Sequence, residues 1–357
     1  MATFDFNPNG KKVILSIDGG GMRGMISISM LAELERMTGK TCQQLFDMVA
    51  GTSTGAIIAA GIAIGMTAQQ LLEVVYRDKL PKAFPKQDLN FWLRYITGGL
   101  KYLYPLETFR EALAPLAQGQ KIKDITHPII LLTTKDVRTS NTYYITNAGP
   151  GAATFAEWPL SGAVAASGAA PIFFPPVAGN MVDGGVGVYG NPCLAAAIEA
   201  MEYIGADRGF TPGNVIEISL GTGYPTNERS DGEADRYWLL DWIKYIIIAG
   251  MDEAQIQQAF NVRAIYRDQI DFRRYNPLLT RENLESNLGI LTEGRPNPSE
   301  LGLDSFKPEE IALMEDIGRV YAHHIDWTKE NQMPWDTVGG HGKPRVLNVN
   351  WDATNYR

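Results

Sequence analysis

Residues 46–55, FDMVAGTSTG, join a short apolar run to a G-x-S-x-G turn. The run at 46–50 predicts a buried strand, and the apolar stretch Ala56–Ala63 predicts a helix that follows the turn directly. A serine between a strand and a helix in this pattern is typical of a nucleophile elbow, whose tight turn projects the hydroxyl. The start of the helix then places backbone N–H groups beside the negative charge that develops in acyl transfer. The segment therefore predicts Ser53 as the nucleophile of a hydrolase.

A glycine cluster, Asp18-Gly-Gly-Gly-Met-Arg-Gly24, follows the first predicted strand, Val13–Ile17. Consecutive glycines leave their backbone N–H groups unobstructed, so these groups can point at a carbonyl oxygen that becomes negative. Removing one such donor typically lowers a reaction rate about 10²–10³-fold. One interpretation of the cluster is therefore an oxyanion hole.

The same cluster also matches G-x-G-x-x-G, which is typical of dinucleotide-binding loops. That fingerprint needs an acidic residue about 20 residues later, at the end of a second strand. Glu35 lies inside a helical pattern and Asp47 precedes the apolar part of its strand, so neither residue fits well. A non-enzymatic nucleotide-binding module that uses this loop is the alternative from a different functional class.

A serine hydroxyl needs a general base, and histidine is the usual one. The sequence offers four histidines, none well placed: His127 before a proline, His323 and His324 at the end of a predicted helix, and His341 between glycines. The better candidate is Asp183, which follows the short strand Met181–Val182 and precedes two glycines. A carboxylate, with a reference pKa of about 3.9, can serve only when it is held against the hydroxyl in a partly desolvated pocket. An Asx-type turn is the structural alternative for this aspartate.

Short apolar runs alternate with helical patterns along the chain, which indicates a parallel sheet with helices on both faces. Further buried strands are predicted at 128–134 and 215–220. Helical periodicity is found at 25–37, at 71–76 behind the capping-box sequence Thr67–Gln70, at 238–250 and at 308–323. We therefore expect an α/β fold.

The 357 residues include 32 Lys and Arg against 40 Asp and Glu, which gives a formal net charge of −8. This charge disfavours a nucleic-acid-binding surface, and any membrane contact must come from a local patch.

Cys42 and Cys193 lie far apart and lack the spacing of a metal site. The first residues show no apolar signal segment, and the longest apolar stretch is too short to span a bilayer. We expect a cytoplasmic protein.

Three motifs occur in a fixed order: the glycine cluster at 18–24, the elbow at 51–55 and Asp183-Gly-Gly185. In this order they resemble the patatin-like phospholipases. The likeness extends to the segments 169–176 and 219–223. Each motif alone is modest support, whereas the ordered set is strong.

The resemblance covers residues 11–223 with good density and thins towards His324. It implies a three-layer α/β/α fold with a mainly parallel central sheet. It also suggests an acyl hydrolase domain at 11–325, followed by a C-terminal tail of unknown role at 326–357.

The resemblance further implies a Ser–Asp dyad, in which Ser53 attacks the ester carbonyl and Asp183 takes its proton directly. The backbone amides of Gly19, Gly20 and Gly21 would hold the oxyanion.

Arg23 matches the family's basic position in the loop, where it would either contact a phosphate head group or anchor the turn.

Family members cleave fatty-acyl esters of phospholipids and related lipids, so we expect a phospholipase A or lysophospholipase that contacts the membrane surface peripherally and uses no metal or other cofactor. Some stand-alone bacterial relatives are switched on by cyclic nucleotides during antiphage defence. A cyclic-nucleotide-activated effector is therefore a second alternative, and the oligomeric state stays open.

Two aromatic segments allow more than one interpretation. Residues 84–104 place aromatic side chains beside Lys and Arg, which suits a lid or a membrane interface as well as an ordinary segment that covers the core. The aromatic and apolar run at 237–248 is more typical of a core than of a partner surface.

Overall fold

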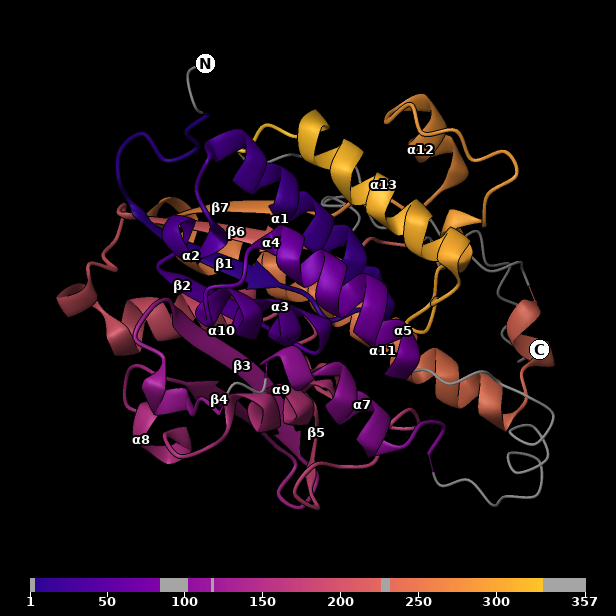
Figure 1. The fold of residues 1–357 in the computed structure, drawn as a ribbon, viewed down its shortest axis with the longest axis horizontal. Coiled ribbons are helices and arrows are strands. Elements are labelled where there is room, and N and C mark those ends of the chain that lie inside the picture. Colours follow the sequence, from indigo (N-terminus) through magenta and orange to yellow (C-terminus); the bar gives the residue numbers. More distant parts are fainter. Residues whose placement is uncertain (1–3, 84–101, 117–118, 226–231, 330–357) are drawn as a thin grey trace, which may run out of the picture.

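A seven-stranded sheet lies at the centre of the protein, in the order β4-β3-β2-β1-β6-β7 with β5 paired to β3 (Figure 1). The computed structural model describes residues 4–83, 102–116, 119–225 and 232–329. The strands are β1 (Lys12–Ile17), β2 (Met48–Gly51), β3 (Ile129–Asp136), β4 (Asn141–Thr146), β5 (Met181–Asp183), β6 (Val215–Leu220) and β7 (Ile270–Tyr275). Strands β3, β2, β1, β6 and β7 run parallel, whereas β4 and β5 run antiparallel to β3. The predicted mainly parallel sheet is confirmed.

Helices cover both faces of this sheet (Figure 1). They are α1 (Gly24–Thr38), α2 (Cys42–Leu45), α3 (Thr54–Ala63), α4 (Ala68–Gln70), α5 (Leu80–Ala83), α7 (Leu106–Ala112), α8 (Ala152–Phe155), α9 (Leu160–Gly168), α10 (Cys193–Ile198), α11 (Leu239–Tyr266), α12 (Arg281–Ser286) and α13 (Pro308–His324). Two π-helical segments, Leu71–Lys79 and Glu199–Ile204, continue α4 and α10.

The side chains of β1 divide the core into two layers, because successive residues on a strand point to opposite faces. Val13, Leu15 and Ile17 pack in one cluster with residues of α1, α3, α9 and α13. Ile14 packs on the other face with residues of α10 and α11. The sheet is therefore buried on both sides, and the three-layer α/β/α arrangement is confirmed.

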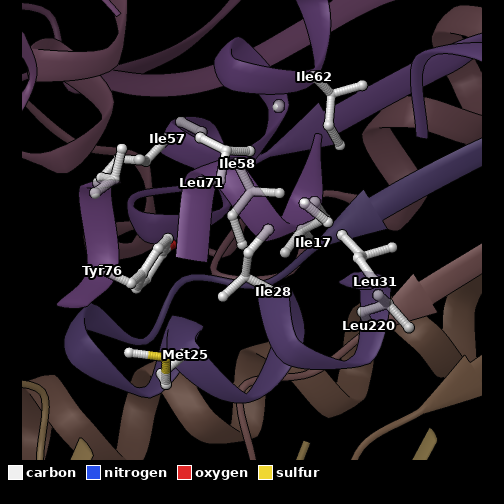
Figure 2. Close-up of a cluster of buried hydrophobic side chains, with 14 of the residues drawn as sticks. Ile17, Met25, Ile28, Leu31, Ile57, Ile58, Ile62, Leu71, Tyr76 and Leu220 are labelled. Atoms are coloured by element: carbon white, nitrogen blue, oxygen red, sulfur yellow. The ribbon is translucent and has the colours of Figure 1, made fainter. Parts of the chain in front are cut away.

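Dense apolar packing joins α1 and α3 to the sheet. Figure 2 shows Ile28 and Leu31 of α1 and Ile58 and Ile62 of α3 gathered near Ile17 of β1. All five side chains are fully buried. Burying one such side chain contributes about 1.5–3 kcal/mol to folding. This packing fixes α3, the helix that begins directly after the predicted nucleophile.

Most predicted elements are present, with their ends shifted by a few residues. The strand predicted at 215–220 coincides with β6, and Thr67 caps α4 through the predicted capping box. Helix α11 continues to Tyr266, well past the predicted end at 250. The sequence patterns do not predict β4 or β7, which contain several polar or charged residues. The aromatic segment at 84–104 lies outside the described residues, apart from 102–104.

Aromatic side chains around the start of α11 are exposed, which corrects the interpretation of 237–248 as core wherever its side chains are described. Trp238 is 81% exposed, Trp242 is 41% exposed and Tyr245 is 43% exposed. The rings of Tyr237, Trp242 and Tyr245 lie 5.3–6.2 Å apart, so they form one surface cluster.

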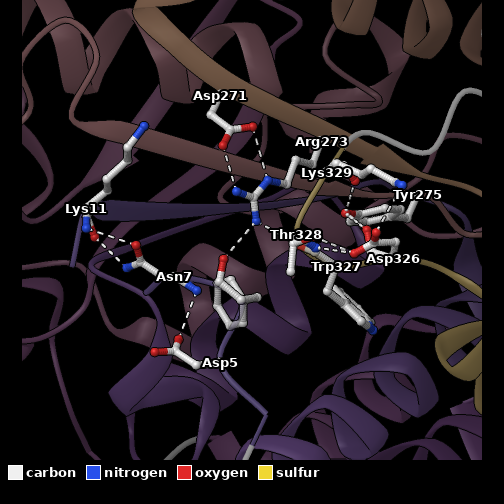
Figure 3. A network of polar contacts seen from close by, with 11 residues as sticks. Asp5, Asn7, Lys11, Asp271, Arg273, Tyr275, Asp326, Trp327, Thr328 and Lys329 are labelled. Carbon is white, nitrogen blue, oxygen red and sulfur yellow. Dashed lines mark hydrogen bonds and ion pairs between the residues drawn. The ribbon is translucent and has the colours of Figure 1, made fainter. Parts of the chain in front are cut away.

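The chain that follows α13 packs against β7. The Arg273 guanidinium donates a hydrogen bond to the carbonyl oxygen of Trp327 at 2.6 Å, and the Tyr275 hydroxyl donates to that of Asp326 at 2.9 Å (Figure 3). The segment predicted as a tail, 326–357, therefore begins with residues that belong to the packed domain. Among the residues that the structure describes, no helix has the length and apolarity that crossing a bilayer requires.

Candidate active site

The ends of three neighbouring parallel strands bring the predicted motifs together. In the register of the sheet, Ile17 of β1 lies beside Gly51 of β2 and beside Leu220 of β6. The glycine cluster starts directly after Ile17, and the elbow starts at Gly51. Both segments therefore leave the sheet at its carboxyl edge, where open α/β sheets place their ligand sites.

Ser53 occupies a strained turn between β2 and α3. Its φ of 56° and ψ of −118° lie in a region that residues other than glycine rarely adopt. A Cβ atom on Gly51 would lie 2.2 Å from the carbonyl oxygen of Gly55, and one on Gly55 would lie 2.2 Å from that of Ile17. The neighbouring backbone leaves no room for a side chain at either glycine, so the elbow pattern has a steric cause.

Side-chain hydrogen bonds hold this turn in place. The backbone N–H of Ser53 donates to the Oγ atom of Ser167, at the end of α9, across 3.0 Å. The Thr52 hydroxyl donates to the carbonyl oxygen of Tyr189 at 2.6 Å and lies 2.7 Å from the hydroxyl of Thr133. Ser167, Thr52 and Thr133 are fully buried. Such surrounding bonds are what allows a strained backbone conformation to persist.

Asp183 lies at the end of β5, opposite Thr134 of β3, and is only 1% exposed. Its carboxylate accepts a hydrogen bond from the backbone N–H of Gly185 at 2.8 Å, and Asp183 and Ser53 line the same pocket. Burial raises the pKa of Asp183 to about 6, and the Ser53 side chain and the Gly185 amide oppose this rise. At neutral pH the carboxyl is therefore mostly ionised, which is the form that can accept a proton.

No histidine in the described part of the chain lines the pocket around the serine. His127 and His324 lie within hydrogen-bonding distance of backbone carbonyl oxygens, and the ring of His323 lies 3.1 Å from the carboxylate of Glu33. His341 lies outside the described residues. The structure brings the serine together with an aspartate instead.

The three glycines predicted for the oxyanion hole differ in what their amides do. The Gly19 amide donates to the carbonyl oxygen of Gly190 at 2.7 Å. The amides of Gly20 and Gly21 donate to no other described residue, and both glycines line the same pocket as Ser53. In this structure two amides of the cluster are therefore available to a ligand, while the third is occupied.

Arg23 is buried below the glycine cluster. Its Nη2 atom lies 3.8 Å from a carboxylate oxygen of Asp252 on α11, and both side chains are more than nine-tenths buried. Its backbone N–H donates to the carbonyl oxygen of Gly20 at 3.1 Å. These contacts favour the anchoring role of Arg23 over contact with a phosphate head group.

An apolar pocket opens beside the serine and the aspartate. Both residues line it, and its apolar wall includes Ile57, Leu80, Phe109, Phe173 and Phe174. The rings of Phe109 and Phe174 stack with their centroids 4.6 Å apart. A serine hydroxyl and a carboxylate thus adjoin a space suited to a hydrocarbon chain. Within the described ranges, no group of three or more His, Cys, Asp and Glu side chains is arranged to hold a metal ion.

The residues that hold the elbow and the glycine cluster in place were not predicted from the sequence. Ser167 is the one hydroxyl residue in the apolar stretch 163–170, and this break in the pattern was its only local signal. Thr52 lies within the predicted elbow and Thr133 within the strand predicted at 128–134, but nothing in their local sequence indicates that they would meet. Asp252 belongs to a part of α11 that the helix prediction did not reach.

Comparison with known proteins points to one family. The model of the patatin-like phospholipase family matches residues 15–197. The cGAMP-activated phospholipase of Escherichia coli is 27% identical over 58% of this chain and 61% of its own length. That of Pseudomonas aeruginosa is 28% identical over 45% of this chain and 48% of its own, so the match spans less than two thirds of either relative. Patatin-like protein 2 of Arabidopsis thaliana is 28% identical over 71% of this chain and 72% of its own length.

Proposed function

The chain belongs to the patatin-like phospholipase family, and we propose that it hydrolyses fatty-acyl esters of membrane phospholipids through an acyl-serine intermediate. The observation that carries this proposal is that Ser53, in its strained elbow, and the buried carboxylate of Asp183 line the same apolar pocket. A hydroxyl with a base beside it is what nucleophilic catalysis at an ester requires.

In the first step, the Oγ atom of Ser53 bonds to the ester carbonyl carbon while its proton passes to Asp183. The carbonyl oxygen becomes negative and accepts hydrogen bonds from the amides of Gly20 and Gly21. The bond to the leaving alcohol then breaks, and the alcohol takes the proton from Asp183. Water attacks the remaining acyl-serine in the second step, with Asp183 accepting the proton of the water and returning it to Ser53.

The acyl chain would occupy the pocket formed by Ile57, Phe109, Phe173 and Phe174. Each methylene group that leaves water contributes about 0.8 kcal/mol, so a long chain gains considerable binding energy there. An apolar pocket next to the serine therefore favours a lipid ester over a small polar ester.

Contact with the lipid surface would come from a local patch, because the net charge of −8 gives no general attraction to anionic membranes. Trp238, Trp242 and Tyr245 are exposed near the start of α11. Trp and Tyr rings are favoured at membrane–water interfaces, where one part of the ring is apolar and another can hydrogen-bond. We include peripheral membrane binding through these side chains in the proposal.

Activation by a cyclic nucleotide is the second candidate feature. The relatives in Escherichia coli and Pseudomonas aeruginosa are named cGAMP-activated phospholipases, and this chain matches 61% and 48% of their lengths. We propose that this protein is likewise regulated, as an effector of antiphage defence. If so, its hydrolytic rate on lipid is low until the signal is added.

Lipid product analysis tests the proposed function. Liposomes of phosphatidylethanolamine and phosphatidylglycerol are incubated with the protein, with and without a panel of cyclic dinucleotides, and the lipids are identified by mass spectrometry. We expect free fatty acid and lysophospholipid from the native protein and neither product from Ser53→Ala. Absence of both products under every condition would contradict the proposal. Equal rates with and without every cyclic dinucleotide would contradict only its regulatory part.

A further inference from the structure

Arg274 reaches from β7 across β6 to the start of the glycine cluster. It lies opposite Ser219 in the register of the two strands, and Ser219 lies opposite Ser16 of β1. Its guanidinium binds the carboxylate of Asp18 at 2.7 and 2.5 Å and donates to the Ser219 hydroxyl at 2.9 Å. Arg274 is 3% exposed and Asp18 is fully buried. The first residue of the cluster is therefore held by a buried two-bond ion pair.

A second buried ion pair holds the other end of the cluster, where Arg23 meets Asp252. Between the two pairs, the carbonyl oxygen of Gly19 accepts hydrogen bonds from the Thr222 hydroxyl at 3.0 Å and from the Gln255 side chain at 3.3 Å. The glycines have no side chains with which to fix themselves. Their position thus depends on the charged residues at either end and on bonds to the Gly19 peptide.

Of the two ion pairs, the one at Asp18 has the shorter contacts. Burial raises the pKa of Asp18, and the Arg274 guanidinium, which donates one hydrogen bond to each carboxylate oxygen, opposes this rise. Removing one partner of a buried ion pair leaves the other charge uncompensated, so the segment that carries it rearranges or takes up a proton. Here the segment that would rearrange contains Asp18, directly before Gly19.

We propose that Arg274 is a positioning residue for the oxyanion hole. Through Asp18 it sets where the glycine cluster leaves β1, and hence where the amides of Gly20 and Gly21 point. This inference rests on the proposed hydrolytic function and adds a residue to it. A displacement of about 1 Å at such a site can cost about 10²-fold in rate, because oxyanion stabilisation depends on preset donor positions.

The chain offers a matched control in the neighbouring residue. Arg273 is on the same strand and 4% exposed, but its side chain points to the other face of the sheet. There it binds Asp271 and the carbonyl oxygen of Trp327 (Figure 3), and neither residue belongs to the glycine cluster. Arg274→Lys and Arg273→Lys therefore make the same chemical change in equally buried places on opposite faces.

The experiment compares both variants on a fluorogenic long-chain ester, together with their thermal unfolding midpoints. Two inhibitors with the acyl chain of the ester are also used. The trifluoromethyl ketone accepts the Ser53 oxygen and forms a tetrahedral oxyanion, whereas the corresponding secondary alcohol fills the pocket without forming one. We expect Arg274→Lys to lower kcat about 10–100-fold with KM within about twofold, and to weaken the ketone by a similar factor but not the alcohol. Arg273→Lys should lower the unfolding midpoint and keep kcat within about threefold.

The proposal is overturned if Arg274→Lys keeps the native kcat, or if it weakens ketone and alcohol equally. Should Arg274→Lys fail to fold, Asp18→Asn replaces it with the same expectations, since the amide keeps the shape of the carboxylate and loses its charge. The same measurements on the native protein separate a failure of the proposed hydrolytic function from a failure of the role proposed for Arg274. If it neither cleaves the ester nor binds the ketone more tightly than the alcohol, the hydrolytic function itself has failed, and the role of Arg274 fails with it.

Discussion

The backbone N–H of Ser53 donates a hydrogen bond to the hydroxyl oxygen of Ser167 across 3.0 Å. Ser53 has a φ of 56°, in a region that costs a residue with a side chain about 1–3 kcal/mol. Ser167 lies near the end of α9 and is fully buried, so it offers a fixed acceptor. The relationship joins the elbow to a helix on the same face of the sheet and helps to maintain the strained conformation that exposes the serine hydroxyl.

The substitution Ser167→Ala removes this acceptor and leaves the Ser53 amide without a partner. We expect kcat for ester hydrolysis to fall about fivefold with little change in KM, because one hydrogen bond contributes about 1 kcal/mol and the loss acts on the proposed nucleophile. Ser29→Ala is a suitable control, since the buried Ser29 hydroxyl donates to the carbonyl oxygen of Met25 within its own helix α1. A native kcat in Ser167→Ala would show that the elbow does not depend on this bond.

The pH dependence of kcat/KM should report the titration of Asp183. Burial raises the pKa of this carboxyl to about 6, and only the ionised form can accept the proton of Ser53. Activity on an uncharged ester should therefore rise with pH, reach half of its maximum near pH 6 and stay constant above about pH 7.5. Below pH 6 it should fall about tenfold per pH unit. A profile that is flat down to pH 4.5 would exclude Asp183 as the base.

Replacing His323 and His324 together by Gln should leave the rate within about twofold of the native value. His323 lies beside Glu33 on the surface, and His324 contacts a backbone carbonyl oxygen of its own helix. Their loss removes the contact of His323 with Glu33 and should lower the unfolding midpoint slightly. A decrease of about 10³-fold or more in kcat would instead indicate a histidine in the catalytic machinery.

Acyl-chain length should control the rate through the pocket wall. Each methylene buried against the wall contributes about 0.8 kcal/mol, which is roughly fourfold in kcat/KM, until the pocket is filled. Phe173→Ser introduces a hydroxyl at a half-buried wall position, so the gain per methylene should decrease while the rate on the acetyl ester stays unchanged. An equal decrease in kcat/KM on acetyl and long-chain esters would mean that Phe173 supports the site without contacting the acyl chain.

The sequence predicts best those elements whose signal is local. Strands β1 and β6 are short apolar runs, so their burial on both faces can be read directly from the residues. Strand β7 contains Arg273 and Arg274 in six residues and does not resemble a buried strand. The structure accommodates both charges because each guanidinium finds a carboxylate on its own side of the sheet. Arg273 pairs with Asp271, two residues before it, whereas the carboxylate that pairs with Arg274 belongs to Asp18, 256 residues away, and leaves no local pattern.

The residues of the candidate site likewise differ in whether a local sequence pattern predicts them. Ser53 and the glycine cluster could be predicted because a turn that excludes side chains demands glycine at fixed spacing. Asp183 could be named from its own short motif and from the family resemblance. Ser167 could not, because its partner lies 114 residues away and the break that it makes in an apolar stretch does not indicate which residue it contacts. The occupied amide of Gly19 likewise depends on a loop that only the folded chain brings close.

The most direct test of the Ser–Asp dyad is the hydrolytic rate of Asp183→Asn beside that of Ser53→Ala. Asp136→Asn serves as the matched control. Asp136 is also a buried carboxylate, lies on β3 opposite Met181 of β5 and does not line the pocket. All three proteins should keep the native circular dichroism spectrum. The dyad predicts a fall of at least about 10³-fold in kcat for Asp183→Asn and for Ser53→Ala, and a rate within about threefold of native for Asp136→Asn. Hydrolysis by Asp183→Asn at the native rate would contradict it.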